Sequence, residues 1–261
     1  MPDRLFDLPL WFIGPAIIVA LCLFSFFGLT VVRHFVLPRI RVETSDSEFS
    51  GAMLQSVMVF YGLAVALISV SVWQTYSEVS SQVSLEATAL AALYRDVGGY
   101  PEPVRSNLQN GIREYTQYVI KEAWPLQRRG EVPKGGVDVM NRFQETLFAV
   151  EPSTENQKLL HTECLRAYNE LIKARRLRLD AVQTGLPTVM WVVILLGALI
   201  GLTASFFFRV DDIRLQLIQV FLLAIFIGLI IFMIFALDRP FRGDLGIGPD
   251  PYQLIYDQLM R

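Results

Sequence analysis

The chain has 261 residues, of which 53% are hydrophobic and 18% are charged, and its formal net charge is −2. A soluble domain usually carries about 25% charged residues, so this composition is not that of an ordinary soluble enzyme. The near-neutral charge gives no electrostatic reason to expect nucleic acid as a partner.

Four long apolar runs hold no charged residue, and they extend over Leu8–Val32, Gly51–Trp73, Leu186–Phe208 and Leu215–Leu237. Each exceeds the ~20 residues that a helix needs to cross ~30 Å of hydrocarbon. A segment in lipid must satisfy its own backbone, and the runs lack the polar alternation of a barrel strand. We therefore expect four transmembrane helices. The first run is too long for the apolar part of a signal peptide and is expected to be retained.

Between the second and third runs lies a polar region that is expected to be helical. From Val79 to Val97 apolar residues recur every three or four positions, and no glycine or proline intervenes before Gly98. The second span is therefore expected to continue past the membrane as one long helix.

Three further helices are expected in this region. The first covers about 108–123 and ends near Gly130, and the second covers about Val137–Phe148. The third follows a Pro-Ser pair, with Ser153 or Thr154 as its N-cap.

The sequence thus predicts an all-α, polytopic membrane protein with a helical domain inserted between the second and third transmembrane helices. The expected boundaries are 1–74 for the first two spans and their loop, 75–185 for the central domain, 186–237 for the last two spans and 238–261 for a tail. Basic residues near the span ends favour a cytoplasmic location for both termini and the central domain, in a cell inner membrane.

We find no catalytic constellation in the sequence, and we expect no enzyme activity, cofactor or metal. His161-Thr-Glu163-Cys164 is the nearest approach to a metal cluster. On a helix, however, His161 and Glu163 point about 200° apart. The two cysteines, Cys22 and Cys164, do not predict a disulfide.

A basic group precedes the third span and consists of Lys173, Arg175, Arg176 and Arg178. Such a group anchors a helix at the lipid headgroups, or it forms a basic wall that concentrates anions at a vestibule. The residues themselves do not choose between these two readings.

Small residues recur at four-residue steps in the last two spans, at Gly197 and Gly201 and again at Ala224 and Gly228. They allow close helix packing, against a partner in the same chain or another. The absence of charge inside the spans disfavours ion-coupled transport. A passive pore with an apolar constriction needs no such charge.

Three segments together resemble a known family. They are the second span with its extension, from Tyr61-Gly62 through Trp73-Gln74-Thr75-Tyr76 to Glu86-Ala87 and Leu93-Tyr94-Arg95; Leu186-Pro187 with Trp191; and Leu237-Asp238-Arg239-Pro240-Phe241-Arg242-Gly243-Asp244. This pattern resembles the bestrophin-like membrane proteins, a bacterial and plant family long labelled only as a domain of unknown function, and more distantly the bestrophin anion channels. The resemblance implies a homo-oligomer, pentameric in bestrophins, that conducts inorganic anions passively across a lipid bilayer.

When the second span is placed on the similar bestrophin helix, the neck positions fall on Gln55, Val59 and Leu63, and Ala66 continues the same face. These four are the pore-lining residues that the resemblance implies; the alternative is ordinary helix packing. Bestrophin necks are rich in phenylalanine, whereas Phe60 here lies off this face.

After the fourth span, Asp238, Pro240, Phe241 and Gly243 resemble the bestrophin Asn-Pro-Phe-Gly stretch, with Asp238 in place of Asn and Arg242 inserted. The acidic residues that help to hold calcium in animal bestrophins are largely missing, so calcium binding is not carried over. The local expectation is a turn that closes the helix. A non-conducting scaffold or sensor, whose cytoplasmic helices bind a partner, remains the alternative function.

Overall fold

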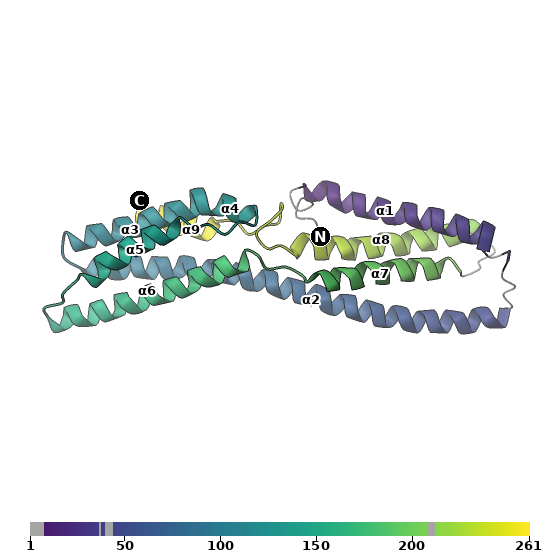
Figure 1. Ribbon diagram of the computed structural model, residues 1–261, viewed down its shortest axis with the longest axis horizontal. Coiled ribbons are helices and arrows are strands. Elements are labelled where there is room, and N and C mark those ends of the chain that lie inside the picture. The colour runs from purple at the N-terminus through teal and green to yellow at the C-terminus, as the bar shows by residue number, and fades with distance from the viewer. Residues whose placement is uncertain (1–7, 37, 40–43, 208–211) are drawn as a thin grey trace. The chain divides into compact units, whose positions relative to one another are not determined.

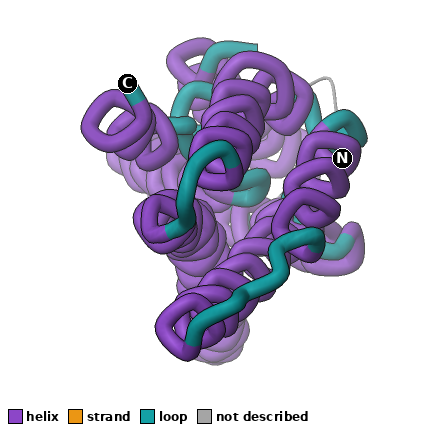
Figure 2. Tube along the Cα trace, turned by 90° about the vertical axis from the view of Figure 1, so that its left-hand side faces the viewer, coloured by secondary structure: helices purple, strands orange, loops and turns teal. Residues whose placement is uncertain are grey.

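A computed structural model describes residues 8–36, 38–39, 44–207 and 212–261, with side chains omitted at 44–50 and 52–54. Within these residues the secondary structure consists of helices joined by loops and turns (Figure 2). The chain divides into two compact units: unit 1 contains residues 1–74 and 185–238, and unit 2 contains residues 75–184 and 239–261.

Unit 1 contains the four expected spans. The described residues contain four helices that are long and apolar enough to cross a membrane, which confirms the prediction from the apolar runs. The helices are α1 (Leu10–Val31), which a π-helical turn extends over Val32–Val36, the first part of α2 (Thr44–Asp96), α7 (Thr188–Ser205) and α8 (Ile213–Leu237) (Figure 1). Phe208, the last residue of the predicted third run, lies outside the described residues.

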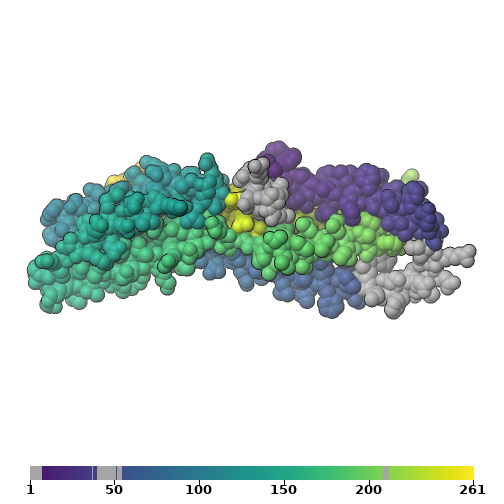
Figure 3. Space-filling view, in the orientation of Figure 1, coloured from purple at the N-terminus to yellow at the C-terminus, as the bar shows by residue number. Residues whose placement is uncertain are grey.

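Glycines set the close packing in unit 1. A Cβ at Gly197 would overlap the ring of Tyr61, and one at Gly201 would lie 2.6 Å from the Met58 sulfur, so α7 packs closely on α2. A Cβ at Gly228 would lie 3.0 Å from the Ile18 side chain, so α8 packs closely on α1. The small residues therefore have partners in the same chain, and Figure 3 shows α1, in purple, packed against the green helices of this unit.

Helix α2 has 53 residues and passes without interruption from unit 1 into unit 2, as its uninterrupted apolar periodicity predicts. It ends at Asp96, where a 3-10 turn over Val97–Gly99 follows. The Gly-Gly pair at the end of the predicted helix accounts for this stop, because glycine destabilises a continuing helix.

Unit 2 also contains the three further helices that the sequence predicts. Their elements are α3 (Val104–Tyr118), a π-helical turn (Val119–Ala123), α4 (Trp124–Arg128), α5 (Gly136–Phe148) and α6 (Glu155–Ala181). The first predicted helix runs through the π turn, which ends two residues before Pro125, a residue without an amide proton to donate. It ends before Gly130, whose φ is +78°.

The N-cap of α6 is Thr154, one of the two predicted candidates. Its side chain accepts a hydrogen bond from the backbone N of Gln157 at 3.2 Å, and the Gln157 side chain accepts from the Thr154 backbone N at 3.3 Å. This reciprocal pair satisfies two backbone donors that a helix start leaves open.

The sequence predicts a separate tail at 238–261, but residues 239–261 pack with the central helices as part of unit 2. They include α9 (Asp250–Ile255) and a π-helical turn over Tyr256–Met260. Phe241, Tyr252 and Met260 are buried in the unit 2 core, and the Trp124 indole Nε1 donates to the Ile247 carbonyl at 3.0 Å.

Candidate functional site

The predicted pore residues share an exposed face of α2. Gln55, Val59, Leu63 and Ala66 are all exposed in the single chain, with Val59 63% and Leu63 58% accessible. At 100° per residue the four lie within an arc of about 80°. Phe60 is exposed as well, about 100° from Val59 around the helix.

Contacts on the other side of α2 fix which face stays open. Val65 and Val72 are buried in the unit 1 core. The Tyr61 hydroxyl donates to the Ile194 carbonyl of α7 at 2.9 Å. Because these contacts set the rotation of α2 in unit 1, Val59 and Leu63 are left uncovered by the described residues.

An apolar groove of about 500 Å³ runs along the flank of this face, between α2 and α8. On α2 it is lined by Met58, Tyr61, Gly62, Val65, Ala66 and Ser69. The Ser69 hydroxyl donates to the Val65 carbonyl at 2.8 Å, so it is already hydrogen-bonded. Ala66 thus borders the groove, whereas Val59 and Leu63 lie outside it.

The predicted basic group does not form a single surface. Lys173 and Arg176 are exposed, and the Arg175 guanidinium lies 5.9 Å from the centre of the Tyr115 ring. Arg178 is only 1% exposed and pairs with Glu86. The prediction of an exposed basic wall or headgroup anchor is therefore wrong for Arg178, because a carboxylate on α2 holds it inside unit 2.

Arg178 and Glu86 form the centre of a buried polar network. The Arg178 Nε donates to Glu86 Oε2 at 2.6 Å and its Nη2 to Oε1 at 3.1 Å, while the Tyr115 hydroxyl donates to Oε1 at 2.7 Å. The guanidinium also lies 5.7 Å from the Trp124 ring and 5.8 Å from the Tyr252 ring. The network therefore ties α2, α3, α4, α6 and α9 together.

Electrostatics favour the charged form of Arg178 and the neutral form of Tyr115 near neutral pH. Burial disfavours the charged guanidinium, but the Glu86 carboxylate outweighs it and holds the pKa of Arg178 well above its ordinary value. Burial, and next the charge of Glu86, raise the pKa of the Tyr115 hydroxyl. Tyr115 therefore stays a hydrogen-bond donor to a carboxylate that is paired with a cation.

The residues of the post-helix motif have separate structural contacts. In unit 1, Asp238 accepts from the Leu186 backbone N at 2.5 Å and from the Trp191 indole Nε1 at 3.2 Å, which connects the end of α8 to the start of α7. In unit 2, the Pro240 carbonyl accepts from the Ile247 backbone N at 2.8 Å. The turn between Pro240 and Ile247 includes Gly243, whose φ of +73° favours glycine.

Phe241 of the same motif packs on Trp124, with ring centres 5.7 Å apart. Among the described residues no three His, Cys, Asp or Glu side chains are placed to share a metal ion. His161 Nδ1 instead lies 2.7 Å from the Tyr100 hydroxyl. Burial raises the pKa of Cys164 to about 11, so its thiol is protonated near neutral pH.

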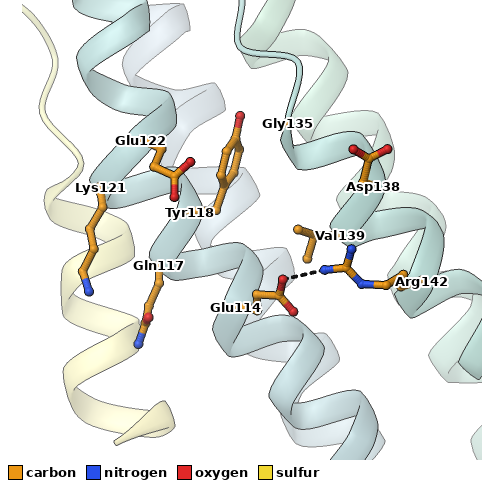
Figure 4. A pocket seen from close by; sticks show the side chains of 9 residues that line it. All are labelled: Glu114, Gln117, Tyr118, Lys121, Glu122, Gly135, Asp138, Val139 and Arg142. Atoms are coloured by element: carbon orange, nitrogen blue, oxygen red, sulfur yellow. Dashed lines mark hydrogen bonds and ion pairs between the residues drawn. The ribbon is translucent and has the colours of Figure 1, made fainter.

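A polar recess of about 520 Å³ lies between α3 and α5 in unit 2 (Figure 4). Glu114 and Arg142 form an ion pair at 2.5 Å across it, with both side chains more than half exposed. Lys121, Glu122 and Asp138 also line the recess and are exposed. Charges of both signs in bulk solvent do not select a ligand of either charge.

The sequence did not predict the burial of Glu86 and Tyr252 or their contacts with Arg178. Glu86 lies three positions after Val83 and immediately before Ala87, on the apolar side of the predicted helix. A carboxylate on such a side signals a buried, paired charge. Tyr252 has no comparable signal, because its burial depends on how the tail packs.

Four apolar spans and a second helical unit define a polytopic, all-helical membrane protein. The sequence pattern of the bestrophin-like domain family matches residues 19–252. The chain therefore belongs to the bestrophin-like family, as the resemblance of its motifs implies.

Solved structures show the same fold. A bacterial bestrophin homologue from Klebsiella pneumoniae, carrying a single substitution, matches with a TM-score of 0.65 at 9% identity, over 94% of this chain and 98% of the other. A structure described as a membrane protein with one substitution matches with a TM-score of 0.66 at 10% identity, over 94% and 97% of the two chains. No curated protein matches the chain.

Proposed function

We propose that the chain forms a homo-oligomeric ion channel of bestrophin-like type that passes inorganic anions passively along the exposed face of α2. Family membership and the shared fold support a channel. The observation that carries the proposal is the open, uncharged face at Val59 and Leu63, on a helix whose other side is anchored in unit 1.

An oligomer gives this face a suitable environment. If α2 faced lipid, the exposed Gln55 amide would meet hydrocarbon, which costs free energy for an unpaired polar group. Around a water-filled axis the amide is hydrated. Val59 and Leu63 then form an apolar constriction of the kind that gates by wetting. We adopt five copies, the number that the family resemblance implies.

The proposal places unit 2 and both termini in the cytoplasm of a cell with an inner membrane, following the distribution of basic residues. Lys173 and Arg176 are exposed on α6 and raise the local concentration of anions wherever this surface borders the pathway. No Asp, Glu, Lys, Arg or His lies inside the apolar runs, so conduction is passive rather than ion-coupled.

The direct test is electrical. Purified protein in planar bilayers is expected to carry chloride current, and Leu63→Ala is expected to increase the conductance about threefold or more, because a smaller side chain lowers the barrier to wetting. Leu222→Ala is the matched control: Leu222 is 62% exposed on α8, against 58% for Leu63, but lies on another helix. It should leave the conductance unchanged.

Absence of anion current from both the wild type and Leu63→Ala would reject the channel. The chain would then be a non-conducting scaffold or sensor whose cytoplasmic helices bind a partner. Equal effects of Leu63→Ala and Leu222→Ala would retain a channel but remove Leu63 from its lining.

A further inference from the structure

The part of α2 that belongs to unit 2 has an exposed face of its own, and its chemistry differs from that at Val59 and Leu63. Ser77, Ser81, Ser84, Thr88 and Arg95 are all exposed. Counted at 100° per residue along this single helix, they lie within an arc of about 60°. These residues form a stripe of hydroxyls that ends at a cation. We call these five residues the hydroxyl face.

The hydroxyl face differs from the other exposed helical surfaces of unit 2. On α6, Lys158 pairs with Glu155, and Arg166 pairs with Glu163 and Glu170. These charged pairs are typical of a helix in bulk water. The exposed stripe of α2 from Ser77 to Thr88 has no charged side chain, although it belongs to the same unit.

Carboxylates on this part of α2 point elsewhere. Glu86 lies about 180° from the hydroxyl face and is bound to Arg178 inside the core. Glu78 is exposed but lies about 100° from Ser77, and Asp96, which is half-buried, lies about 100° from Arg95. The only charge on the hydroxyl face is therefore the positive one of Arg95, for which the described residues supply no ion-pair partner.

The hydroxyls suit a hydrated pathway. The Ser84 hydroxyl donates to the Ser80 carbonyl at 3.2 Å, and the Thr88 hydroxyl donates to the Ser84 carbonyl at 2.9 Å. Neither bond uses the side-chain oxygen as an acceptor. Ser77 and Ser81 have hydroxyls that can rotate to donate to an anion or to water. A guanidinium keeps its charge at any physiological pH, so Arg95 attracts anions continuously.

We infer that the hydroxyl face lines the part of the ion pathway that follows the apolar constriction, and that Arg95 selects anions over cations at its end. This inference rests on the proposed channel function. It adds the residues that determine the sign of the permeant ion, which the uncharged face at Val59 and Leu63 does not supply.

Charge reversal at Arg95 tests the selectivity. In planar bilayers under a KCl gradient, Arg95→Glu is expected to lower the chloride-to-potassium permeability ratio about tenfold, because a charge at a confined mouth changes the local ion concentration. Arg95→Gln should shift the reversal potential less, in the same direction. The control Lys134→Glu makes the same charge change at an exposed position outside the hydroxyl face and should leave the ratio unchanged.

Cysteine accessibility tests the lining independently. Ser81→Cys should react with a negatively charged methanethiosulfonate reagent and lose anion current, while Thr162→Cys, an exposed position on α6, should react without a change in current. The wild type, which contains the free cysteines Cys22 and Cys164, shows whether the reagent changes the current by reacting with either of them.

The possible failures are distinguishable. If the wild type conducts anions but the permeability ratio of Arg95→Glu and Arg95→Gln equals that of Lys134→Glu, the inference is overturned and the channel stands. A conducting Ser81→Cys channel that resists the reagent makes the hydroxyl face a packed contact, which also overturns it. If the wild type carries no current, the proposed function itself fails.

Discussion

The two units of the chain have cores built on different principles. In unit 1, α7 contacts α2 where Gly197 and Gly201 receive Tyr61 and Met58, and α8 contacts α1 where Gly228 receives Ile18. In unit 2, the core surrounds an ion pair between Glu86 and Arg178. Shape joins the helices of the first unit, and a buried polar network is central to the second.

The difference reflects the solvents for which the units are suited. Lipid tails are as apolar as leucine, so spans gain little by burying apolar surface and associate by close packing. In water, apolar burial supplies the driving force, but a buried ion pair helps to specify one arrangement among many compact ones. This contrast leads to three measurable expectations.

The largest effect is expected at the ion pair. Arg178→Met leaves the Glu86 carboxylate buried without its cation and should destabilise unit 2 by about 3–5 kcal/mol. Hydrogen exchange along α6 in detergent-solubilised protein measures the loss. Arg176→Met, at an exposed position on the same helix, should change exchange little.

Removal of both partners should restore most of that stability, because a well-packed apolar pair replaces a buried ion pair at small cost. The double variant Glu86→Leu, Arg178→Met is the check. Unchanged exchange in Arg178→Met alone would contradict a core centred on this pair.

An intermediate effect is expected from one methyl group in unit 1. Gly197→Ala places a Cβ against the Tyr61 ring, which hydrogen-bonds to Ile194, and should cost about 1–3 kcal/mol by overpacking. Gly62→Ala is the matched control, because nothing lies within 4 Å of its Cβ position. Thermal unfolding in detergent compares the two; equal midpoints would argue against assembly of unit 1 by shape.

The smallest effect is expected at the start of α6. Thr154→Ala removes the N-cap hydrogen bond to Gln157 and should cost about 1 kcal/mol. The loss should appear as faster amide exchange in the first turn of α6. Thr162→Ala, within the same helix, provides the comparison, and equally fast exchange in both variants would mean that the cap adds nothing local.

The helices were predictable because each follows from a local pattern. Apolar length identifies the spans, three- and four-residue periodicity identifies α2 beyond Trp73, and a Ser-Thr pair before a polar helix identifies the N-cap of α6. These patterns depend on residues close in sequence, so no knowledge of tertiary contacts was needed.

The contacts that join distant segments were harder to predict from the sequence. Arg178 belongs to a run of basic residues that reads as one surface, and only its helical phase and the position of Glu86 bury it. Tyr252 carries no periodic signal, and its burial arises from tertiary packing of a short helix. For the candidate site, spacing placed Val59 and Leu63 on one face, whereas the exposure of that face depends on contacts with α7.

The division of unit 2 along the chain also bears on how the protein is made. Residues 75–184 and 239–261 form this unit, with the α7 and α8 spans between them. Tyr252, which packs over the Glu86–Arg178 pair, is therefore synthesised only after both spans. Because domains tend to fold as their chain emerges, unit 2 must wait with an incomplete core while α7 and α8 of unit 1 are delivered to the bilayer. Completion of the unit 2 core thus reports that both α7 and α8 have been synthesised.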